Sequence, residues 1–313
     1  MVQHFINLLN WSSDKLTYLL DKAIFLKHEY MTGGNRPYLK GKTLAMIFQR
    51  ASLRTRISFE IAIQHLGGHS TNIDFNEIGL GKRESISDVT KVLGRYVHSI
   101  VIRIDDYADL VQIAKCSPIP VINGLTKYNH PCQIMADVLT MYEEFSRLEG
   151  LKVVYVGHSN QDVARSLLFA STKFGFHLTI SSPENYLLDA ESIELARASS
   201  GETRFQFVSD PHEAVRSADV IYTDVWISVT RSTDPVEAGY RGRVLAPYQI
   251  NDELMAQAPS HAIVMHCMPA NRGQEITDTV ADGYQSRIFE QAENRLHIQK
   301  SILLHLMGSA EWH

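Results

Sequence analysis

The stretch TLAMIFQRASLRTRISFEIAIQHLGG, residues 43–68, reads as one strand, one loop and one helix in succession. Its first seven residues form a short apolar run, and its last fourteen carry apolar residues at helical spacing before two glycines. Further along, the apolar runs SIVIRI (99–104) and PVIN (120–123) are separated by a segment with helical spacing. Strands and helices that alternate in this way predict a parallel sheet covered by helices.

The same alternation starts again after a long helical segment, PCQIMADVLTMYEEFSRLEG (131–150), which ends at a glycine. Five more strand candidates follow: KVVYVG (152–157), HLTISS (177–182), RFQFVS (204–209), VIYTDVW (220–226) and AIVMHCM (262–268). We therefore predict an α/β protein with two doubly wound parallel-sheet domains joined by a long helix. The first domain would span residues 1–135 and the second 136–290, and the last helix, within 291–313, would pack back on the first domain.

The composition restricts the class of function. The chain has 313 residues, of which 44% are hydrophobic and 21% charged, as expected of two soluble domains. Its formal net charge of -5 argues against nucleic acid or an anionic membrane as partner and favours a small-molecule substrate. We see no secretory leader and no membrane-spanning run. The spacing of the three cysteines (Cys116, Cys132 and Cys267) matches neither a disulfide framework nor a zinc site, so we expect reduced thiols. We expect a cytoplasmic protein without metal or cofactor.

The loop in the opening stretch, residues 52–56, combines two arginines with two hydroxyl side chains at a predicted helix start. Unpaired N–H groups at a helix start attract anions, and hydroxyls and guanidinium groups complement a tetrahedral phosphate. Taken alone, the loop is better interpreted as a capped, solvated helix start, because short motifs often match by chance.

Three other places offer groups that could join this loop. Arg103 ends a predicted strand, His130 and Gln133 of HPCQ (130–133) begin a predicted helix, and Arg295 begins the last helix. Each could be a surface ion pair or a capping residue by itself. Their occurrence together is better explained by an anion site at the carboxyl ends of the first set of strands.

Four stretches, in this order and at this spacing, resemble the carbamoyltransferases, and most closely the ornithine carbamoyltransferases. Residues 52–56 are similar to that family's carbamoyl-phosphate loop, with Leu53 for the usual Thr, and HPCQ is similar to its His-Pro-x-Gln. MHCMPANRGQEIT (265–277) resembles its His-Cys-Leu-Pro segment, with Met268 for Leu, and FEQAENRLHIQK (289–300) its closing helix. The resemblance covers nearly the whole chain.

The resemblance implies transfer of the carbamoyl group of carbamoyl phosphate to an amine, normally that of L-ornithine, giving L-citrulline and phosphate. It implies a first domain that binds carbamoyl phosphate, a second that binds the amino acceptor, and a homo-oligomer built from trimers whose sites are completed near residues 75–83. The carbamoyl-phosphate residues would be Ser52, Leu53, Arg54, Thr55, Arg56, Arg103, His130, Gln133, Cys267, Met268 and Arg295. The catalytic residues would be Arg103, His130, Asp224, Cys267 and Arg295. Asp224 and Cys267 would help to deprotonate the amine, because a free alkyl amine titrates near pH ~10.

The acceptor half departs from the family pattern. The residues that correspond to its acceptor site are Gln161, Asp162, Asp224, Ser228 and Val229. Gln161 and Asp162 replace an Asn-Asn pair, and Val229 and Thr230 replace Met-Gly. A carboxylate beside a substrate carboxylate is repulsive unless a cation intervenes, and Arg165 is a candidate for that cation.

Three hypotheses follow. The chain could be an ornithine carbamoyltransferase with an altered acceptor pocket. It could instead be a carbamoyltransferase for another amine, such as putrescine or a modified amino acid, with Asp162 binding a second cationic group of that substrate. It could also be an inactive carbamoyl-phosphate-binding paralogue. Aspartate as acceptor is disfavoured because neither DVWIS (224–228) nor HCMP (266–269) supplies the added cations that two carboxylates would need. A dinucleotide site is disfavoured because VGHSNQ (156–161) lacks the glycine-rich turn.

Overall fold

The computed structural model describes residues 2–79, 84–200, 204–226 and 235–308. The chain divides into two compact units, residues 1–139 with 293–313 and residues 140–292. The predicted boundaries, at residues 135 and 290, lie close to this division. No helix in the described parts of the chain is long and apolar enough to cross a membrane.

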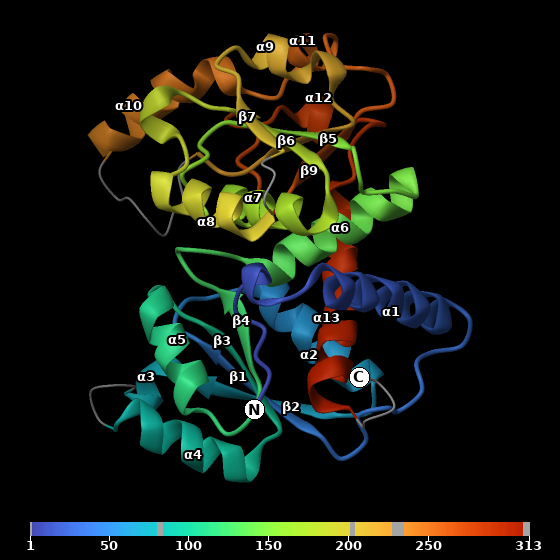
Figure 1. Ribbon diagram of the computed structural model, residues 1–313, viewed down its shortest axis with the longest axis vertical. Helices are drawn as coiled ribbons and strands as arrows, with labels where there is room; N and C mark the ends of the chain where they lie inside the picture. Colours follow the sequence, from blue (N-terminus) through green and yellow to red (C-terminus); the bar gives the residue numbers. More distant parts are fainter. Residues whose placement is uncertain (1, 80–83, 201–203, 227–234, 309–313) are drawn as a thin grey trace. The chain divides into compact units, whose positions relative to one another are not determined.

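The first unit contains a sheet of four parallel strands (Figure 1). They are β1 (Thr43–Phe48), β2 (His69–Asp74), β3 (Ser99–Arg103) and β4 (Val121–Leu125), in the order β2-β1-β3-β4. Phe48, Arg103 and Leu125 are aligned across the three strands β1, β3 and β4. The loops that follow these strands therefore begin at one edge of the sheet, which is where parallel sheets bind ligands.

Strand β2 was not predicted from the sequence. Its residues, HSTNID, are mostly polar, and most of them are exposed or half-buried because β2 is the edge strand of its sheet. An edge strand needs no continuous apolar run, so the signal that marks β1 and β3 is missing here.

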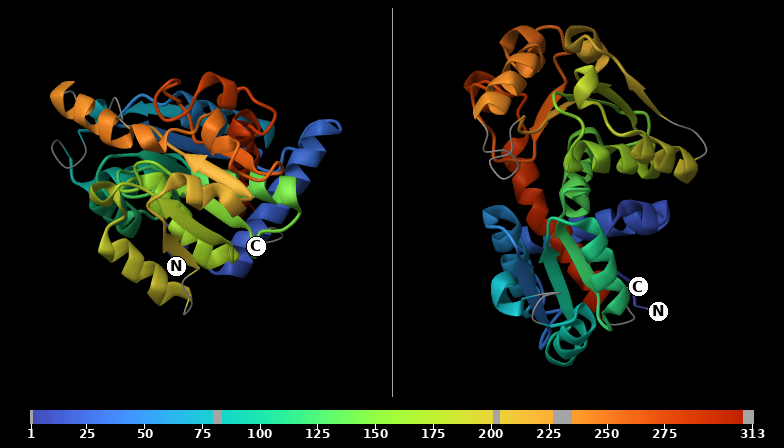
Figure 2. Two further views of the ribbon diagram at one scale, coloured as in Figure 1. Left: turned by 90° about the horizontal axis from the view of Figure 1, so that it is seen from above. Right: turned by 90° about the vertical axis from the view of Figure 1, so that its left-hand side faces the viewer.

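Helices cover both faces of this sheet (Figures 1 and 2). The helical elements of the unit are η1 (Leu8–Asn10), α1 (Ser13–Met31), α2 (Leu53–His65), α3 (Phe75–Ile78), α4 (Ile86–Tyr96), α5 (Tyr107–Cys116), the start of α6 (Pro131–Phe145) and most of α13 (Ile288–Met307). Ala45 and Ile102 of the sheet pack with Leu110 and Ile113 of α5 and with Leu93 of α4 in one apolar cluster.

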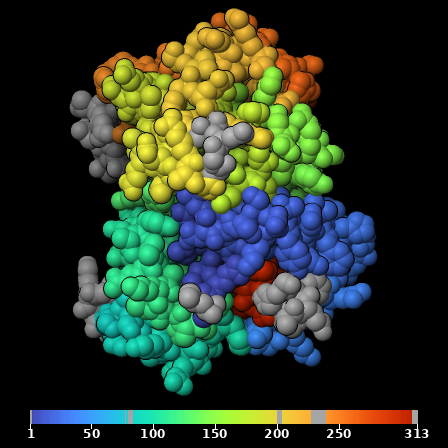
Figure 3. Space-filling model, viewed as in Figure 1, coloured from blue at the N-terminus to red at the C-terminus, as the bar shows by residue number. Residues whose placement is uncertain are grey.

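The last helix packs on the first unit, as predicted. Ser301 of α13 donates its hydroxyl to the Leu19 carbonyl of α1 at 2.7 Å, and Lys27 of α1 donates to the Asn294 amide oxygen at 2.8 Å. Only a small area of α13 (red) is visible beside the blue N-terminal segments on the face in Figure 3. This packing holds Arg295, which is itself buried, in the first unit.

The second unit contains five parallel strands, and all five predicted strands are confirmed. They are β5 (Lys152–Val156), β6 (His177–Ser181), β7 (Phe205–Phe207), β8 (Val220–Thr223) and β9 (Ile263–His266), in the order β7-β6-β5-β8-β9. The helical elements are α7 (Asp162–Phe174), η2 (Glu184–Tyr186), α8 (Ala190–Ser200), α9 (Pro211–Ala214), η3 (Val215–Ser217), α10 (Pro235–Leu245), η4 (Ala246–Tyr248), α11 (Asp252–Met255) and α12 (Asp278–Ala281). Two parallel sheets within α/β units confirm the predicted fold class.

The strand order of the second unit reverses between β5 and β8, and the chain turns tightly where β5 ends. Gly157 follows β5 with a φ of +119°, and a Cβ atom there would lie 3.0 Å from the Trp226 ring nitrogen. A side chain at residue 157 would therefore push apart the segments that follow β5 and β8. Glycine at 157 allows the segments that carry Gln161 and Asp224 to leave the ends of the neighbouring strands β5 and β8 close together.

Candidate active site

In the first unit, His130 lies within the field of three arginines. The imidazole is buried, and burial together with the charges of Arg295, Arg103 and Arg54 holds the pKa of His130 well below its usual range. His130 is therefore a neutral imidazole among cations, a combination that favours an anionic or strongly polar ligand.

A buried hydrogen-bonded turn positions His130. Asn123, near the end of β4, donates to the Asn129 side-chain oxygen at 2.6 Å, and the Thr126 N–H donates to the Asn129 carbonyl at 3.1 Å. The turn closes immediately before Pro131, which begins α6. Proline suits the first position of a helix, so the local sequence sets both the turn and the helix start.

Arg295 joins two residues that are distant in the sequence. Its guanidinium donates to the Gln133 side-chain oxygen at 2.6 Å and to the Thr55 hydroxyl at 2.8 Å, and all three residues are buried. Gln133 in turn donates to Asp137 at 2.8 Å. Asp137 was not among the predicted site residues, although it lies four residues after Gln133 on the same predicted helix.

The loop at 52–56 is not a helix start capped by its own serine. Ser52 makes no side-chain hydrogen bond to the N–H groups of α2, and its hydroxyl instead accepts from Arg103 at 2.9 Å. The simpler interpretation of the loop required that capping bond. The Ser52 side chain is directed to a cation on the neighbouring strand instead.

Two predicted residues of this loop lie on the outer face of α2. The Leu53 side chain is 70% exposed, and Arg56 pairs with Glu60 at 3.7 Å. The contacts described above bring Ser52, Thr55, Arg103, Gln133 and Arg295 together, but not Leu53 or Arg56.

In the second unit, Asp224 and Cys267 follow the neighbouring strands β8 and β9. The Cys267 thiol donates to an Asp224 carboxylate oxygen at 3.0 Å. Burial is the main cause that raises the pKa of Asp224 to about 6, with the nearby charge of Asp162 adding to it and the Cys267 hydrogen bond opposing it. A carboxylate with this pKa can accept a proton near neutral pH.

A buried histidine supports this pair. The His266 ring accepts the Met268 N–H at 2.9 Å through Nδ1, and Nε2 is 3.0 Å from Glu275. The main-chain N–H of His266 donates to Gln291 at 2.9 Å. His266 and Glu275 were not among the predicted site residues, because the contact between them depends on how residues 266–276 fold.

Asp224, His266 and Cys267 also form a possible metal-ligand group, with their ligand atoms within 4.8 Å of one another. Both ring nitrogens of His266 already contact protein groups. That leaves a thiol and one carboxylate, fewer protein ligands than a tetrahedral zinc site uses.

Gln161 is a buried connector in the second unit. Its amide nitrogen donates to the carbonyls of Val225 at 2.8 Å and His158 at 3.1 Å, so it ties the segment after β5 to the segment after β8. Asp162 is the first residue of α7 and is buried. Ser228 and Val229, together with Thr230, lie outside the residues that the structure describes.

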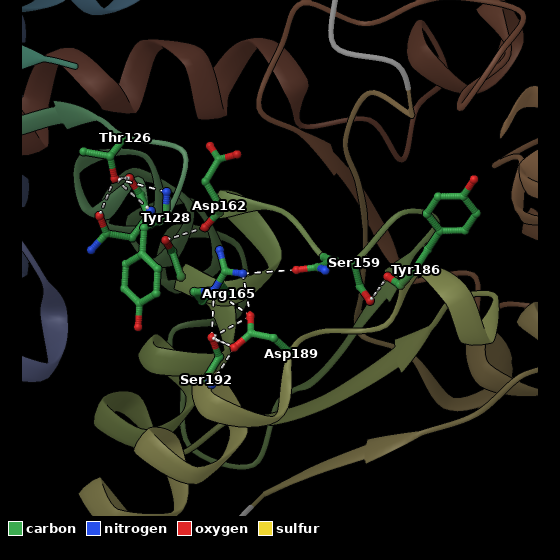
Figure 4. Close-up of polar contacts among 11 residues, drawn as sticks. Thr126, Tyr128, Ser159, Asp162, Arg165, Tyr186, Asp189 and Ser192 are labelled. Atoms are coloured by element: carbon green, nitrogen blue, oxygen red, sulfur yellow. Dashed lines mark hydrogen bonds and ion pairs between the residues drawn. The ribbon is translucent and has the colours of Figure 1, made fainter. Parts of the chain in front are cut away.

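Arg165 is part of a polar network (Figure 4). It donates to Asp189 at 2.6 Å, to Ser192 at 2.7 Å and to the Asn160 side-chain oxygen at 3.2 Å. The Asp162 carboxylate points away from Arg165 in Figure 4. The cation that the sequence suggested as a partner for Asp162 is therefore engaged with Asp189.

Comparisons with known proteins give matches along nearly the whole chain. The family model for the carbamoyl-phosphate-binding domain of aspartate/ornithine carbamoyltransferase matches residues 3–143. The model for the Asp/Orn-binding domain of the same family matches residues 149–306.

Similar curated proteins and solved structures are named ornithine carbamoyltransferases. Ornithine carbamoyltransferase from Archaeoglobus fulgidus is 43% identical over 307 residues, which is 98% of each chain. The chloroplastic ornithine carbamoyltransferase of Pisum sativum is 44% identical over 98% of this chain and 81% of its own. The solved ornithine carbamoyltransferase from Pyrococcus furiosus superposes with a TM-score of 0.93 at 41% identity, covering 97% of both chains.

Proposed function

Because this chain belongs to the aspartate/ornithine carbamoyltransferase family, we propose that it transfers the carbamoyl group of carbamoyl phosphate to the side-chain amine of L-ornithine. The products are L-citrulline and phosphate. The observation that carries the proposal is the neutral His130 within the field of Arg54, Arg103 and Arg295.

The first unit would bind carbamoyl phosphate. Ser52, Arg54 and Arg103 would hold the phosphate, because charge-assisted hydrogen bonds to its oxygens are strong. Thr55, Gln133 and Arg295, which already form a hydrogen-bonded chain, would hold the carbonyl end together with His130. Donors fixed in advance stabilise the negative charge that the carbonyl oxygen gains on attack.

The second unit would bind the amine. An alkyl amine is protonated at neutral pH and cannot attack until it loses a proton. Asp224, with a pKa of about 6, is ionised near pH 7 and would accept that proton or stabilise the ammonium before its loss. Cys267, hydrogen-bonded to Asp224, would share this role and help bind the carbamoyl group, with Met268 next to it.

The comparisons support ornithine over another acceptor, because the curated relatives that match nearly the full chain are named ornithine carbamoyltransferases. We place the acceptor at Gln161, Asp162 and Asp224, with Ser228 and Val229 from outside the described residues. Leu53 and Arg56 remain proposed carbamoyl-phosphate-binding residues, since both line one pocket with Ser52.

We further propose a cytoplasmic homo-oligomer built from trimers, as the family resemblance implies. Cys116, Cys132 and Cys267 are all free thiols, which fits a reducing compartment. Mass photometry of the purified chain checks the assembly: a trimer or a multiple of it is expected, and a stable monomer at micromolar concentration would contradict it.

Ureido-product formation with a panel of acceptors tests the function. With carbamoyl phosphate as donor, we expect ornithine to give the highest kcat/KM among ornithine, putrescine, lysine, N-acetylornithine and aspartate. Ornithine and lysine differ by one methylene, a difference that a binding pocket discriminates by about 10–200-fold, so we expect their kcat/KM values to differ within that range. A clear preference for putrescine would show that the acceptor is a diamine and not ornithine. If no amine gives a product, the protein binds carbamoyl phosphate without turning it over.

Asp162 provides a second test of the acceptor side. We expect Asp162→Asn to lower the KM for ornithine about fivefold, because it removes a negative charge near the substrate carboxylate. The same change should move the acid limb of the pH profile to lower pH, because Asp162 contributes to the raised pKa of Asp224. An unchanged KM would place Asp162 away from the acceptor, and an unchanged pH profile would remove its influence on Asp224.

A further inference from the structure

The loops that follow three neighbouring strands of the first unit meet at one carboxylate. Asp105, in the loop after β3, accepts hydrogen bonds from Arg50, in the loop after β1, through both Nε (2.8 Å) and Nη2. The Lys127 ammonium, in the loop after β4, lies 3.2 Å from the same carboxylate. We propose that Asp105 is a positioning residue that holds these three loops in the arrangement that binds phosphate, an inference that rests on the proposed function.

Main-chain hydrogen bonds join the same loops. The Asp105 N–H donates to the Gln49 side-chain oxygen at 2.8 Å, and the Lys127 N–H donates to the Asp105 carbonyl at 3.0 Å. The Gln49 N–H donates to the Arg103 carbonyl at 2.9 Å. Asp105 therefore connects the loops through its carboxylate, its N–H and its carbonyl.

A group proposed to contact carbamoyl phosphate lies within or directly beside each of the three loops. Ser52 follows Arg50 by two residues, Arg103 precedes Asp105 by two, and His130 follows Lys127 by three. A displacement of any loop would move its group relative to the others. Because several donors must meet one tetrahedral anion, a shift of about 1 Å is enough to lower binding or rate substantially.

The partly exposed pair of Asp105 and Arg50 is suited to holding loops in place more than to stabilising the whole fold. The side chains of Asp105 and Arg50 are 24% and 36% exposed, so the pair adds little to global stability. The hydrogen bond from Arg50 is the main cause that lowers the pKa of Asp105, and Lys127 adds to it. The carboxylate is thus ionised at neutral pH, and its paired geometry restricts the loop positions.

The sign of the effect separates positioning from simple electrostatics. Asp105 is a negative charge near a proposed anion site, so its removal by itself should strengthen phosphate binding. If Asp105 acts by holding the loops, its removal should weaken phosphate binding. The two explanations predict opposite changes in one measurement.

The test is calorimetric binding of inorganic phosphate to the full-length protein, together with the KM for carbamoyl phosphate. For Asp105→Ala we expect about tenfold weaker phosphate binding and a similar rise in that KM, with the KM for ornithine unchanged. Asp105→Asn, which keeps one acceptor for Arg50, should fall between wild type and Asp105→Ala. The double variant Arg50→Ala/Asp105→Ala should weaken binding by less than the sum of the two single variants, because the residues act as one unit.

The matched control is Glu144→Ala, which removes another carboxylate paired bidentately with an arginine, Arg287, at 2.8 and 2.7 Å and at similar exposure. It should leave phosphate binding unchanged. Phosphate binding that is unchanged or tighter in Asp105→Ala overturns the proposal, as does a wild-type protein that binds no phosphate. Failure of the proposed function is seen separately, as absence of ureido product from a wild-type protein that binds phosphate.

Discussion

Arg295→Ala is expected to lower kcat/KM for carbamoyl transfer by about 10³-fold, since the loss of one oxyanion donor alone costs about 10²–10³. The guanidinium is buried and donates to both Gln133 and Thr55, so its removal deletes a charge and releases two other proposed donors. Most of the loss should be in kcat, because these contacts would strengthen as the carbonyl oxygen becomes negative. Steady-state kinetics with saturating ornithine measure it.

Arg295→Lys separates charge from geometry. Lysine keeps the positive charge but has no planar fork that could reach Gln133 and Thr55 together, so it should recover less than about tenfold of the lost activity. Arg287→Ala serves as the control, because Arg287 is an arginine of the second unit that pairs with Glu144. An Arg295→Ala variant that retains a tenth of wild-type kcat/KM would exclude Arg295 from the reaction.

Asp224→Asn is expected to abolish the acid limb of the pH profile and to lower kcat/KM for ornithine by about 10³-fold. In the wild type, kcat/KM should rise with pH through about 6, because Asp224 must be ionised to accept a proton or a hydrogen bond from the ammonium. A pH–rate series for both proteins measures the change. A wild-type profile that is flat between pH 5 and 7 would contradict the role of Asp224.

The same variant should be more stable than the wild type at neutral pH. The folded-state pKa of Asp224 is raised from 3.8 to about 6, so the folded protein binds this proton more tightly than the unfolded chain. Stability linked to this group is therefore present at low pH and is lost as pH rises between those values. A shift of about two pKa units corresponds to about 3 kcal/mol, so Asp224→Asn should raise the Tm at pH 8 and change it little at pH 4. An equal change in Tm at both pH values would assign the effect to packing.

Each unit contains a titratable group whose charged form is disfavoured by its surroundings. Asp224 is ionised in a buried position at the pH where it would act, and burial opposes that ionisation. His130 is held neutral beside cations, which disfavours its protonation. Groups with pKa values perturbed by their surroundings are typical of active sites, and both lie at positions that the sequence had singled out.

The fold class follows from the order of residues along the chain. Apolar runs with helical segments between them mark the buried strands, because a strand covered on both faces needs continuous apolar residues. The same pattern placed Arg103, Asp224 and Cys267 at strand ends, and parallel strands bring such ends to one edge of a sheet. Strand β2 was not predicted, because an edge strand can be polar and then lacks an apolar run.

Which of these groups meet depends on how the helices and strands pack. Arg295 contacts Thr55 across 240 residues of sequence, and Arg50 contacts Asp105 across 55, distances at which no periodic pattern carries information. It also decided that Arg165 pairs with Asp189, and that Leu53 and Arg56 lie on the outer face of α2. The physical reason is that spacing along the chain fixes which face or end of an element a residue occupies, whereas side-chain partners depend on how separate elements pack.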